Sequence, residues 1–492
     1  MGTLTIILYG LLLVVFINTI IAIITIFREP RDIMSTLAWL MVLIFIPVLG
    51  FLLYGFFGRG IPKSQVLNIK GQTHKDVSTE INEQKQQLGK FDEQSNPNNK
   101  IVNDAAEQVK MFMNNDLAPL QGSNEIEVFT GGDTFVNQLF TDIDNAKSSI
   151  NIEFYTFASD KIGTKALNVL VAAAKRGVDV KVSYDAWGSM STHEQFFKPL
   201  FEAGGHAYPF LHNKNNILDM RVNYRDHHKL ITIDGKIGYI GGLNLGDQYM
   251  GWDPKFGNWR DCMIRVKGHG VYGMQSKFIP DWNATAPKNR IDFNSPTEMK
   301  KYYPENATDG KAIMQIVSSG PISEKQQIKK GYIKLIQSAK HSIKLTTPYL
   351  IPDPSVIDAL TIAAESGVDI QIITPDMPDH PFVYRATQWY TRQLIDLGCK
   401  VYAYNDGFMH AKTMVVDDKL VSIGSANFDY RSFSLNFECN AFVYDKKLAK
   451  EMEEIFKVDL ENATQRTKEY FENEGWWLNF KQHFSRLMSP LM

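Results

Sequence analysis

Two short segments of the chain, 183 residues apart, carry the same four polar residues in the same register. In each, a lysine follows the histidine by two residues, an aspartate comes five residues later, and an asparagine ten residues after that. These residues are His227, Lys229, Asp234 and Asn244 in the first segment and His410, Lys412, Asp417 and Asn427 in the second. A lone His-x-Lys is usually a core or surface pair, but two copies in register indicate a shared chemical role.

Strand geometry places the histidine and lysine of each segment together. Short apolar, β-branched runs at 230–233 and 413–416 are each followed by a turn and a second run, which predicts two hairpins. Residues i and i+2 share a face of a strand, so each histidine projects beside its lysine. Each aspartate lies on the order of 16 Å further along an extended chain. It belongs to the repeated pattern, and we expect it to cap the turn and not to touch the reacting atoms.

These residue types suit attack on a phosphodiester, and the sequence contains no cysteine or histidine cluster with metal-ligand spacing. One imidazole attacks phosphorus, and the other donates a proton to the leaving alkoxide and later takes one from the acceptor alcohol. Lys229 and Lys412 neutralise charge on the non-bridging oxygens, and three phosphate-binding donors are expected to assist them. These donors are Asn244, Ser425 and Asn427.

A nucleophilic imidazole must also be turned by its second nitrogen, usually by a carboxylate. Asp261 follows His227 by 34 residues and Glu438 follows His410 by 28, both within apolar, strand-like runs. An unpaired charge in such a run is costly. We therefore expect these two carboxylates to orient the histidines, with an ordinary ion pair as the alternative.

The repeated pattern resembles the HKD signature of the phospholipase D superfamily, H-x-K-x(4)-D-x(6)-G-[GS]-x-N. The surrounding residues resemble bacterial cardiolipin synthases over nearly the whole chain. The segments that carry this likeness are 234–244, 259–261, 281–283, 347–349 and 486–491. One departure is visible: Gly242 stands where the second copy has Ser425, so only the second half offers a hydroxyl there. The resemblance implies His227 as the nucleophile and His410 as the acid and base.

The acceptor alcohol decides the activity. Water gives a phospholipase D, whereas the terminal hydroxyl of phosphatidylglycerol gives cardiolipin and glycerol. Exchange of one phosphodiester for another is nearly balanced in energy, and the sequence has no Walker phosphate loop or zinc motif, so no cofactor and no metal are predicted. Transfer to phosphatidylglycerol is the favoured interpretation, with a phospholipase D hydrolase or a phospholipase D-type phosphatidylserine synthase as the alternative. A membrane-tethered nuclease and an inactive lipid-binding scaffold are more distant alternatives.

The repeat extends beyond the signature, since segments such as 146–150 and 339–343, or 176–180 and 366–370, correspond in the two halves. We expect an α/β fold of two tandem phospholipase D-like sandwich halves related by a pseudo-twofold axis, preceded by an N-terminal transmembrane helical hairpin. The predicted boundaries are transmembrane helices at 4–27 and 33–58, a polar linker at 59–112, the first half at 113–283, a linker at 284–312 and the second half at 313–492.

The two N-terminal segments have no ionised side chain, and each exceeds the roughly 20 residues that a bilayer requires. A basic n-region and an Ala-x-Ala cleavage site are missing, which argues against a signal peptide. Basic residues are more frequent after the second segment than between the two, so the catalytic part is expected on the cytoplasmic side of the cell membrane.

The composition of the chain limits the kinds of partner that we expect it to bind. The chain has 492 residues, 44% of them apolar, and a net charge of −2, which disfavours a nucleic-acid partner. Its three cysteines are far apart and are expected to be buried thiols. An aromatic tail at 470–486 is expected either to lie at a lipid surface or to pack on the second half. Because both halves contribute to one site, no oligomer is required.

Overall fold

The computed structural model describes residues 2–28, 33–58, 75–211, 224–292, 295–323 and 325–492. The chain divides into two compact units, one made of residues 1–67 and 213–224 and the other of residues 68–212 and 225–492. Each unit is described by itself.

The N-terminal unit is helical, with α1 (Thr3–Arg28), α2 (Ile33–Phe45), α3 (Pro47–Leu53) and the π-helical turn η1 (Tyr54–Gly58). The helix predicted to run through 33–58 is interrupted at Pro47, which lacks the N–H that would continue the helical ladder. A small core of Ala22, Ile26, Leu43 and Tyr54 joins the helices.

Among the residues that the structure describes, no helix combines the length and the apolar character needed to cross a bilayer. The transmembrane pair expected at 4–27 and 33–58 therefore stays a prediction.

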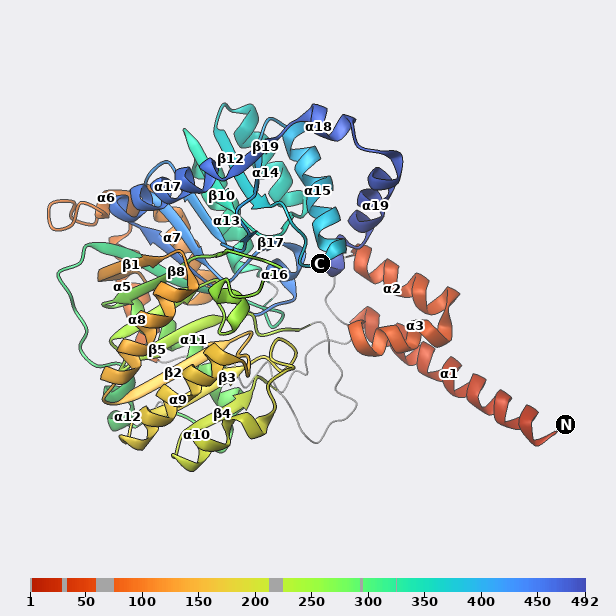
Figure 1. The fold of residues 1–492 in the computed structure, drawn as a ribbon, viewed down its shortest axis with the longest axis horizontal. Coiled ribbons are helices and arrows are strands. Elements are labelled where there is room, and N and C mark those ends of the chain that lie inside the picture. Colours follow the sequence, from red (N-terminus) through yellow and green to blue (C-terminus); the bar gives the residue numbers. More distant parts are fainter. Residues whose placement is uncertain (1, 29–32, 59–74, 212–223, 293–294, 324) are drawn as a thin grey trace. The chain divides into compact units, whose positions relative to one another are not determined.

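The larger unit contains two α/β halves (Figure 1). The first half consists of β1 (Gln121–Phe129), α8 (Gly132–Asn145), β2 (Ser149–Phe154), α9 (Lys161–Lys175), β3 (Asp179–Tyr184), η2 (Glu194–Phe197), α10 (Lys198–Glu202), β4 (His206–Pro209), β5 (Lys229–Ile233), β6 (Ile237–Gly241), η3 (Asp247–Met250), β7 (Trp259–Arg260), β8 (Met263–Lys267) and α11 (Gly270–Thr285).

The second half repeats this order and adds helices at its end. It consists of β9 (Ala312–Ser319), α13 (Gln327–Ser338), β10 (Ser342–Thr346), β11 (Leu350–Ile351), α14 (Pro354–Glu365), β12 (Asp369–Pro375), α15 (Pro381–Asp396), β13 (Lys400–Tyr404), β14 (Phe408–Met409), β15 (Thr413–Val416), β16 (Leu420–Gly424), β17 (Phe428–Asp429), α16 (Tyr430–Ser434), β18 (Glu438–Tyr444), α17 (Lys446–Glu461), β19 (Ala463–Arg466), α18 (Lys468–Glu472), α19 (Trp476–Leu487) and η4 (Ser489–Leu491).

One 15-stranded sheet runs through both halves, in the order β19-β13-β12-β10-β15-β16-β18-β9-β1-β8-β6-β5-β2-β3-β4. The halves meet where β1 pairs with β9. Outward from this joint each half has an antiparallel hairpin, β5–β6 or β15–β16, followed by three parallel strands. The predicted α/β fold and the repeat of its two halves are confirmed.

The apolar cores explain why the halves fold together. One cluster lies mainly in each half, although that of the first half includes Phe408 of the second. A third contains residues of both, among them Leu230 and Ile264 from the first half and Ile423 and Val443 from the second. Burial on this scale makes each half depend on the other for part of its hydrophobic stabilisation.

The segment before the first half differs from the polar linker expected at 59–112. Its described part forms α5 (Lys75–Gln87), α6 (Asn99–Asp104) and α7 (Ala106–Asp116). Val102, Val109 and Phe112 are buried in the core of the second half, and the Phe112 ring centroid lies 4.5 Å from that of Phe442. Apolar residues at helical spacing within a polar stretch carry this packing.

The segment expected as a linker at 284–312 also packs on the first half. It includes α12 (Pro296–Tyr302), and the buried Tyr302 hydroxyl accepts a hydrogen bond from Lys181 and donates one to Asp179.

Candidate active site

The two signature aspartates hold loops and do not face the histidines. The Asp234 carboxylate accepts hydrogen bonds from the backbone N–H groups of Lys147, Ser148 and Ser149, just before and at the start of β2. The Asp417 carboxylate accepts from those of Lys340, His341 and Ser342, before and at the start of β10. Each aspartate therefore ties its own hairpin turn to the next strand of the sheet.

Backbone pairing between the halves positions both histidines. The His227 N–H donates to the Phe437 carbonyl at 2.9 Å, and the His410 N–H donates to the Arg260 carbonyl at 2.7 Å. Just before His410, β14 pairs in parallel with β7 of the first half. Each histidine thus lies on a segment whose backbone is hydrogen-bonded to the opposite half.

His227 is held by a carboxylate from the second half. Its Nδ1 lies 2.9 Å from both carboxylate oxygens of Glu438. Glu438 also accepts hydrogen bonds from Ser425 at 2.5 Å, from Ser432 at 2.7 Å and from Asn436 at 3.3 Å. Glu438 is fully buried, and burial raises its pKa to about 7.

His410 is held in the same way by a carboxylate from the first half. Its Nδ1 lies 2.6 Å from Asp261 Oδ2, and Asp261 also accepts from the Cys262 backbone N–H at 2.7 Å. Burial acts to raise the pKa of Asp261, but the charges of Lys412 and His410 hold it below its ordinary value. Gly242 makes this pair possible, because a Cβ there would lie 2.1 Å from Asp261 Oδ1.

The two lysines complete a symmetrical arrangement. Lys229 Nζ donates to the His227 carbonyl at 2.8 Å, and Lys412 Nζ donates to the His410 carbonyl. Lys412 Nζ also lies 2.9 Å from His410 Nδ1, but that nitrogen is already engaged by Asp261, so we treat Lys412 as a neighbouring charge. Burial lowers the pKa of Lys229 to about 7 and that of Lys412 to about 8.

The two histidines and the two lysines act on one another electrostatically. Burial lowers the pKa of His227 well below its ordinary value, and the charges of Lys229, Lys412 and His410 lower it further. Burial and the Lys412 charge lower the pKa of His410 to about 4, and the charge of Lys229 adds to this. Such mutual effects require short separations. Since both Nδ1 atoms are engaged by carboxylates, Nε2 is the ring nitrogen that each histidine could offer to a substrate.

The predicted phosphate-binding residues take different places. Asn244 Oδ1 accepts from the Thr156 N–H at 3.1 Å, which leaves its amide N–H groups to donate. Asn427 is buried, and its Oδ1 has no hydrogen-bond partner among the residues that the structure describes. Ser425, in contrast, directs its proton to Glu438, so in this geometry it positions a carboxylate and does not offer a donor to phosphate.

Several neighbours of the histidines were not anticipated from the sequence. The Tyr155 ring meets His227 edge-on, with centroids 5.1 Å apart, and Lys229 Nζ lies 5.3 Å from the centroid of the same ring. The Trp259 ring lies 5.0 Å from that of His410. Tyr155 ends the run at 151–155 that corresponds between the halves, which was the one signal available for it.

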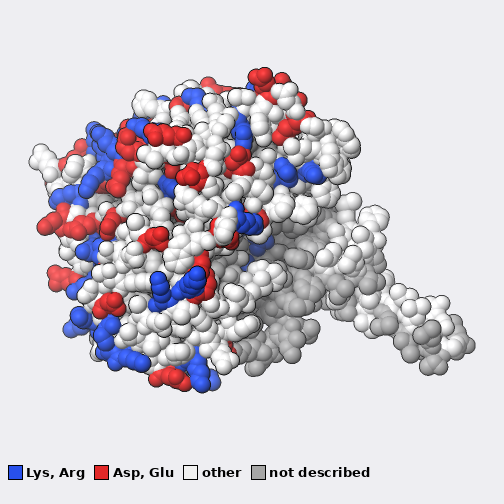
Figure 2. Space-filling view, in the orientation of Figure 1, with Lys and Arg blue, Asp and Glu red and all other residues white. Residues whose placement is uncertain are grey.

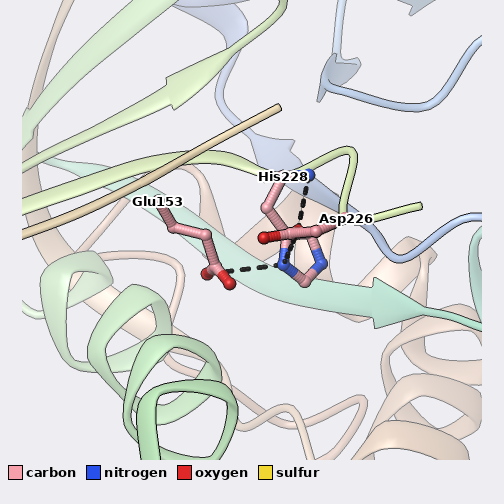
Figure 3. Close-up of side chains that lie close together, drawn as sticks. All are labelled: Glu153, Asp226 and His228. Carbon is pink, nitrogen blue, oxygen red and sulfur yellow. Dashed lines mark hydrogen bonds and ion pairs between the residues drawn. The ribbon is translucent and has the colours of Figure 1, made fainter. Parts of the chain in front are cut away.

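A buried cluster of acidic side chains around His228 was also not anticipated from the sequence; Figure 3 shows Glu153, Asp226 and His228 close together. His228 Nδ1 is 3.3 Å from Asp226, 3.4 Å from Glu153 and 3.6 Å from Asp281. Burial raises the pKa of Glu153 and of Asp226 well above the ordinary range, and that of Asp281 to about 6. Protonation of these carboxyls removes charge that burial would make costly.

Glu153, Asp226 and His228 also bring one ligand-type atom each within 4.8 Å of one another, so this donor set could hold a cation. The expectation that the protein uses no metal stays a prediction. The alternation of side chains along a strand explains the location, since His228 must face away from His227 and Lys229.

Comparison with known proteins identifies the family. Residues 139–277 and 332–460 match the family described as "Cardiolipin synthase, PLD-like domain", and residues 17–59 match "Phospholipase_D-nuclease N-terminal". The chain is 43% identical over 488 residues to the cardiolipin synthase of Listeria monocytogenes serotype 4a (strain HCC23), covering 98% of this chain and 99% of that protein. It is 43% identical over 476 residues to the major cardiolipin synthase ClsA of Bacillus subtilis (strain 168), covering 97% of each.

A solved structure shares the fold. The crystal structure of phosphatidylserine synthase from Haemophilus influenzae Rd KW20 superimposes with a TM-score of 0.60 at 16% identity, covering 78% of this chain and all of that one. Two HKD segments converging in one α/β unit, together with relatives similar over almost their whole length, lead to one conclusion. The chain belongs to the bacterial cardiolipin synthase family of the phospholipase D superfamily.

Proposed function

We propose that the protein transfers a phosphatidyl group from one phosphatidylglycerol to the terminal hydroxyl of another, giving cardiolipin and glycerol. The observation that carries the proposal is the pair of histidines whose Nδ1 atoms are each held by a carboxylate of the opposite half. This arrangement leaves two Nε2 atoms and two lysine ammonium groups for one phosphodiester. The family of the chain and the names of its relatives support phosphatidylglycerol as the substrate.

In the first step, His227 Nε2 attacks phosphorus and the bond to the glycerol oxygen breaks. His410 gives its Nε2 proton to that oxygen, so glycerol leaves as a neutral alcohol. The lowered pKa of His227 keeps it neutral and nucleophilic. Lys229 and Lys412 oppose the charge on the non-bridging oxygens, with Asn244 and Asn427 as further proposed contacts.

In the second step, His410 takes the proton from the hydroxyl of a second phosphatidylglycerol. The resulting oxygen attacks the phosphohistidine, and the bond between His227 and phosphorus breaks. Asp261, whose pKa is held low, keeps a negative charge beside His410 and favours its protonated form when a phosphate anion offsets the lysine charges. This difference between the two carboxylates supports His227 as the nucleophile and His410 as the acid and base.

The family match supports a membrane as partner, and the surface charge argues against a nucleic acid. The match of residues 17–59 to an N-terminal family segment supports a membrane-bound protein, with its catalytic unit proposed on the cytoplasmic side. On the face drawn in Figure 2, basic and acidic side chains are interspersed over the described residues. Such a mixed surface does not favour a polyanionic nucleic acid.

The test is incubation of the purified full chain with phosphatidylglycerol as the only lipid. Cardiolipin and glycerol in equal amounts are expected, and the His227→Ala variant serves as the inactive control. Phosphatidic acid as the main product would instead establish a hydrolase. Formation of phosphatidylserine when serine and a nucleotide-activated lipid are supplied, without cardiolipin from phosphatidylglycerol, would establish the phosphatidylserine synthase alternative.

Trapping of the intermediate assigns the histidines. With a substrate whose leaving group needs no proton, such as an aryl phosphodiester, His410→Ala is expected to accumulate phosphoenzyme, whereas His227→Ala forms none. The reverse pattern would exchange the two roles.

A further inference from the structure

The helix α19 buries polar residues and exposes apolar ones, the reverse of a usual surface helix. Its buried residues are polar, namely Gln482 and Ser485, which are 1% and 2% exposed. Its large apolar residues face outward. Trp476, Trp477, Phe480, Phe484 and Leu487 are 78%, 53%, 53%, 49% and 73% exposed. A surface helix of a globular protein normally turns its apolar side to the core, so this side is built to meet something other than water.

The inner side of α19 is fixed to the second half and not loosely placed. The helix lies along α15, as Figure 1 shows. Gln482 donates to Gln388 of α15 at 3.4 Å, His483 packs on Trp389 with ring centroids 6.2 Å apart, and the Arg486 guanidinium lies 4.1 Å from the centroid of that ring. The outward aromatic side is thus presented by a rigid element.

The outward side chains form one continuous aromatic surface. The Trp477 and Phe480 rings stack with centroids 5.5 Å apart, and Phe480 stacks on Phe484 at 6.4 Å. From Trp476 to Met492 the chain carries Lys481 and Arg486 and no acidic residue. Aromatic rings beside basic groups suit the headgroup region of an anionic bilayer, where the rings are half apolar and half hydrated.

The end of α19 is connected to the active site. The following turn η4 packs on α16, and the Met492 carbonyl accepts a hydrogen bond from the Arg431 N–H at 2.8 Å. In the same short helix, Ser432 donates to Glu438, which holds His227. A surface that binds lipid at α19 is therefore joined to the element that supports the nucleophile.

We propose that the aromatic face of α19 (Trp476, Trp477, Phe480, Phe484 and Leu487) is a membrane-docking surface that seats the catalytic unit on bilayers containing anionic lipid. The proposal rests on the proposed function for the identity of that lipid, phosphatidylglycerol. Docking through α19 would hold the site at the depth of the lipid phosphates, in addition to any anchoring by the N-terminal segment. It also explains why a helix leaves five large apolar residues uncovered.

The direct test uses spin labels on the full chain in vesicles that contain phosphatidylglycerol. Phe480→Cys and Phe484→Cys introduce labelling sites, since Cys262, Cys399 and Cys439 are buried. Lys457→Cys on α17, whose side chain is 57% exposed, is the matched control. Labels at 480 and 484 are expected to be relaxed more by oxygen than by a water-soluble nickel chelate, and the label at 457 the reverse.

Strong relaxation of the 480 and 484 labels by the nickel chelate would show that the face stays in water and would overturn the proposal. Exclusion of both relaxants would overturn it as well, because another protein surface, either a second copy or the N-terminal segment, would then cover the face. These readouts do not depend on catalysis, so they stand even if the protein makes no cardiolipin.

A kinetic test follows with the double variant Phe480→Ser and Phe484→Ser. The mole fraction of phosphatidylglycerol that gives half-maximal rate in vesicles is expected to rise roughly tenfold. Turnover of a short-chain phosphatidylglycerol dissolved as monomers is expected to stay unchanged, because neither residue belongs to the site. An unchanged half-saturating fraction in vesicles, or an equal loss with the monomeric substrate, would contradict docking through α19.

Discussion

At the scale of single residues, each histidine that we propose to be catalytic is held by a carboxylate from the opposite half. Glu438→Gln and Asp261→Asn keep the shape of the side chain but remove the charge behind His227 and His410. Each change is expected to lower kcat for phosphatidylglycerol roughly a hundredfold or more. The two variants should differ with an aryl phosphodiester, whose leaving group needs no proton.

Rapid-mixing measurement of the aryl alcohol burst separates the two roles. Glu438→Gln is expected to slow the burst, because the nucleophile itself is misoriented. Asp261→Asn is expected to leave the burst near the rate of the unaltered protein and to slow only the later turnover. Equal bursts in both variants would show that the carboxylates do not divide the two steps in this way.

The ionisation of the buried Lys412 is expected to shape the alkaline limb of the pH profile of kcat/KM. Its pKa is lowered to about 8, so the ammonium group loses its proton as the pH rises through this value. Substrate phosphate then loses an opposing charge. Because Lys229, with a pKa of about 7, loses its proton first, kcat/KM is expected to fall above pH 7 and more steeply above pH 8. In Lys412→Arg the guanidinium stays charged, so one ionisation should vanish from the alkaline limb even though the altered geometry lowers the rate. If the alkaline limb of Lys412→Arg keeps the slope of the unaltered protein, the ionisation belongs to another group.

Gly242 shows how a residue without a side chain serves the site. A Cβ at this position would lie 2.1 Å from Asp261 Oδ1, so Gly242→Ala is expected to push the carboxylate away from His410. The variant should reproduce the kinetics of Asp261→Asn: a retained burst and slow turnover. Gly122→Ala, where no atom lies within 4 Å of the added carbon, is the control. A Gly242→Ala protein with full turnover would mean that Asp261 can shift without loss.

At the scale of elements, the signature aspartates act through the fold. Asp417 accepts three backbone hydrogen bonds at the loop that leads into β10. Asp417→Ala is expected to lower the free energy of unfolding by about 1–3 kcal/mol, with a smaller loss for Asp417→Asn, which keeps one acceptor oxygen. Denaturant titration measures the stability, and kcat of the folded fraction at low temperature should stay near that of the unaltered protein. A large loss of kcat without a loss of stability would instead place Asp417 in the chemistry.

The hairpins and their turns could be predicted from the sequence because they depend on local patterns. Short apolar, β-branched runs, a turn aspartate and the His-x-Lys spacing specify β5–β6 and β15–β16 directly. The pairing of carboxylates could not be predicted in this way. Asp261 follows His227 in the first half but holds His410, because the partner is set by how β7 meets β14 between the halves.

Two further features could not be predicted from the sequence because they depend on tertiary packing. Residues 99–116 are polar in composition, yet α6 and α7 bury Val102 and Phe112 in the core of the second half. The cluster of Glu153, Asp226 and His228 joins side chains from β2 and from the segment before β5, which no sequence spacing relates. The helical spacing of Val102, Val109 and Phe112 can indicate helices but not the core on which they pack, and the contacts of the buried cluster leave no periodic signal. Only the folded chain displays these contacts.

At the scale of the whole molecule, the crosswise pairs predict that one chain holds one complete site. His227 needs Glu438, His410 needs Asp261, and the strands that contain or adjoin these residues, β5, β8, β15 and β18, belong to one continuous sheet. A mixture of His227→Ala and His410→Ala proteins, reconstituted together in the same vesicles, is therefore expected to regain no cardiolipin synthesis. Each chain in the mixture lacks one of its two imidazoles, and the intact imidazole of a neighbour belongs to a different sheet.

Mixing the unaltered protein with His227→Ala at varying ratios provides the control, with a rate proportional to the unaltered fraction. Recovery of even a quarter of the unaltered rate in the mixture of two inactive variants would place the halves of a site on different chains. The crosswise hydrogen bonds would then have to form between molecules, with the hairpins β5–β6 and β15–β16 exchanged between two copies. Linear dependence in the control together with no recovery in the mixture is the outcome that the single 15-stranded sheet predicts.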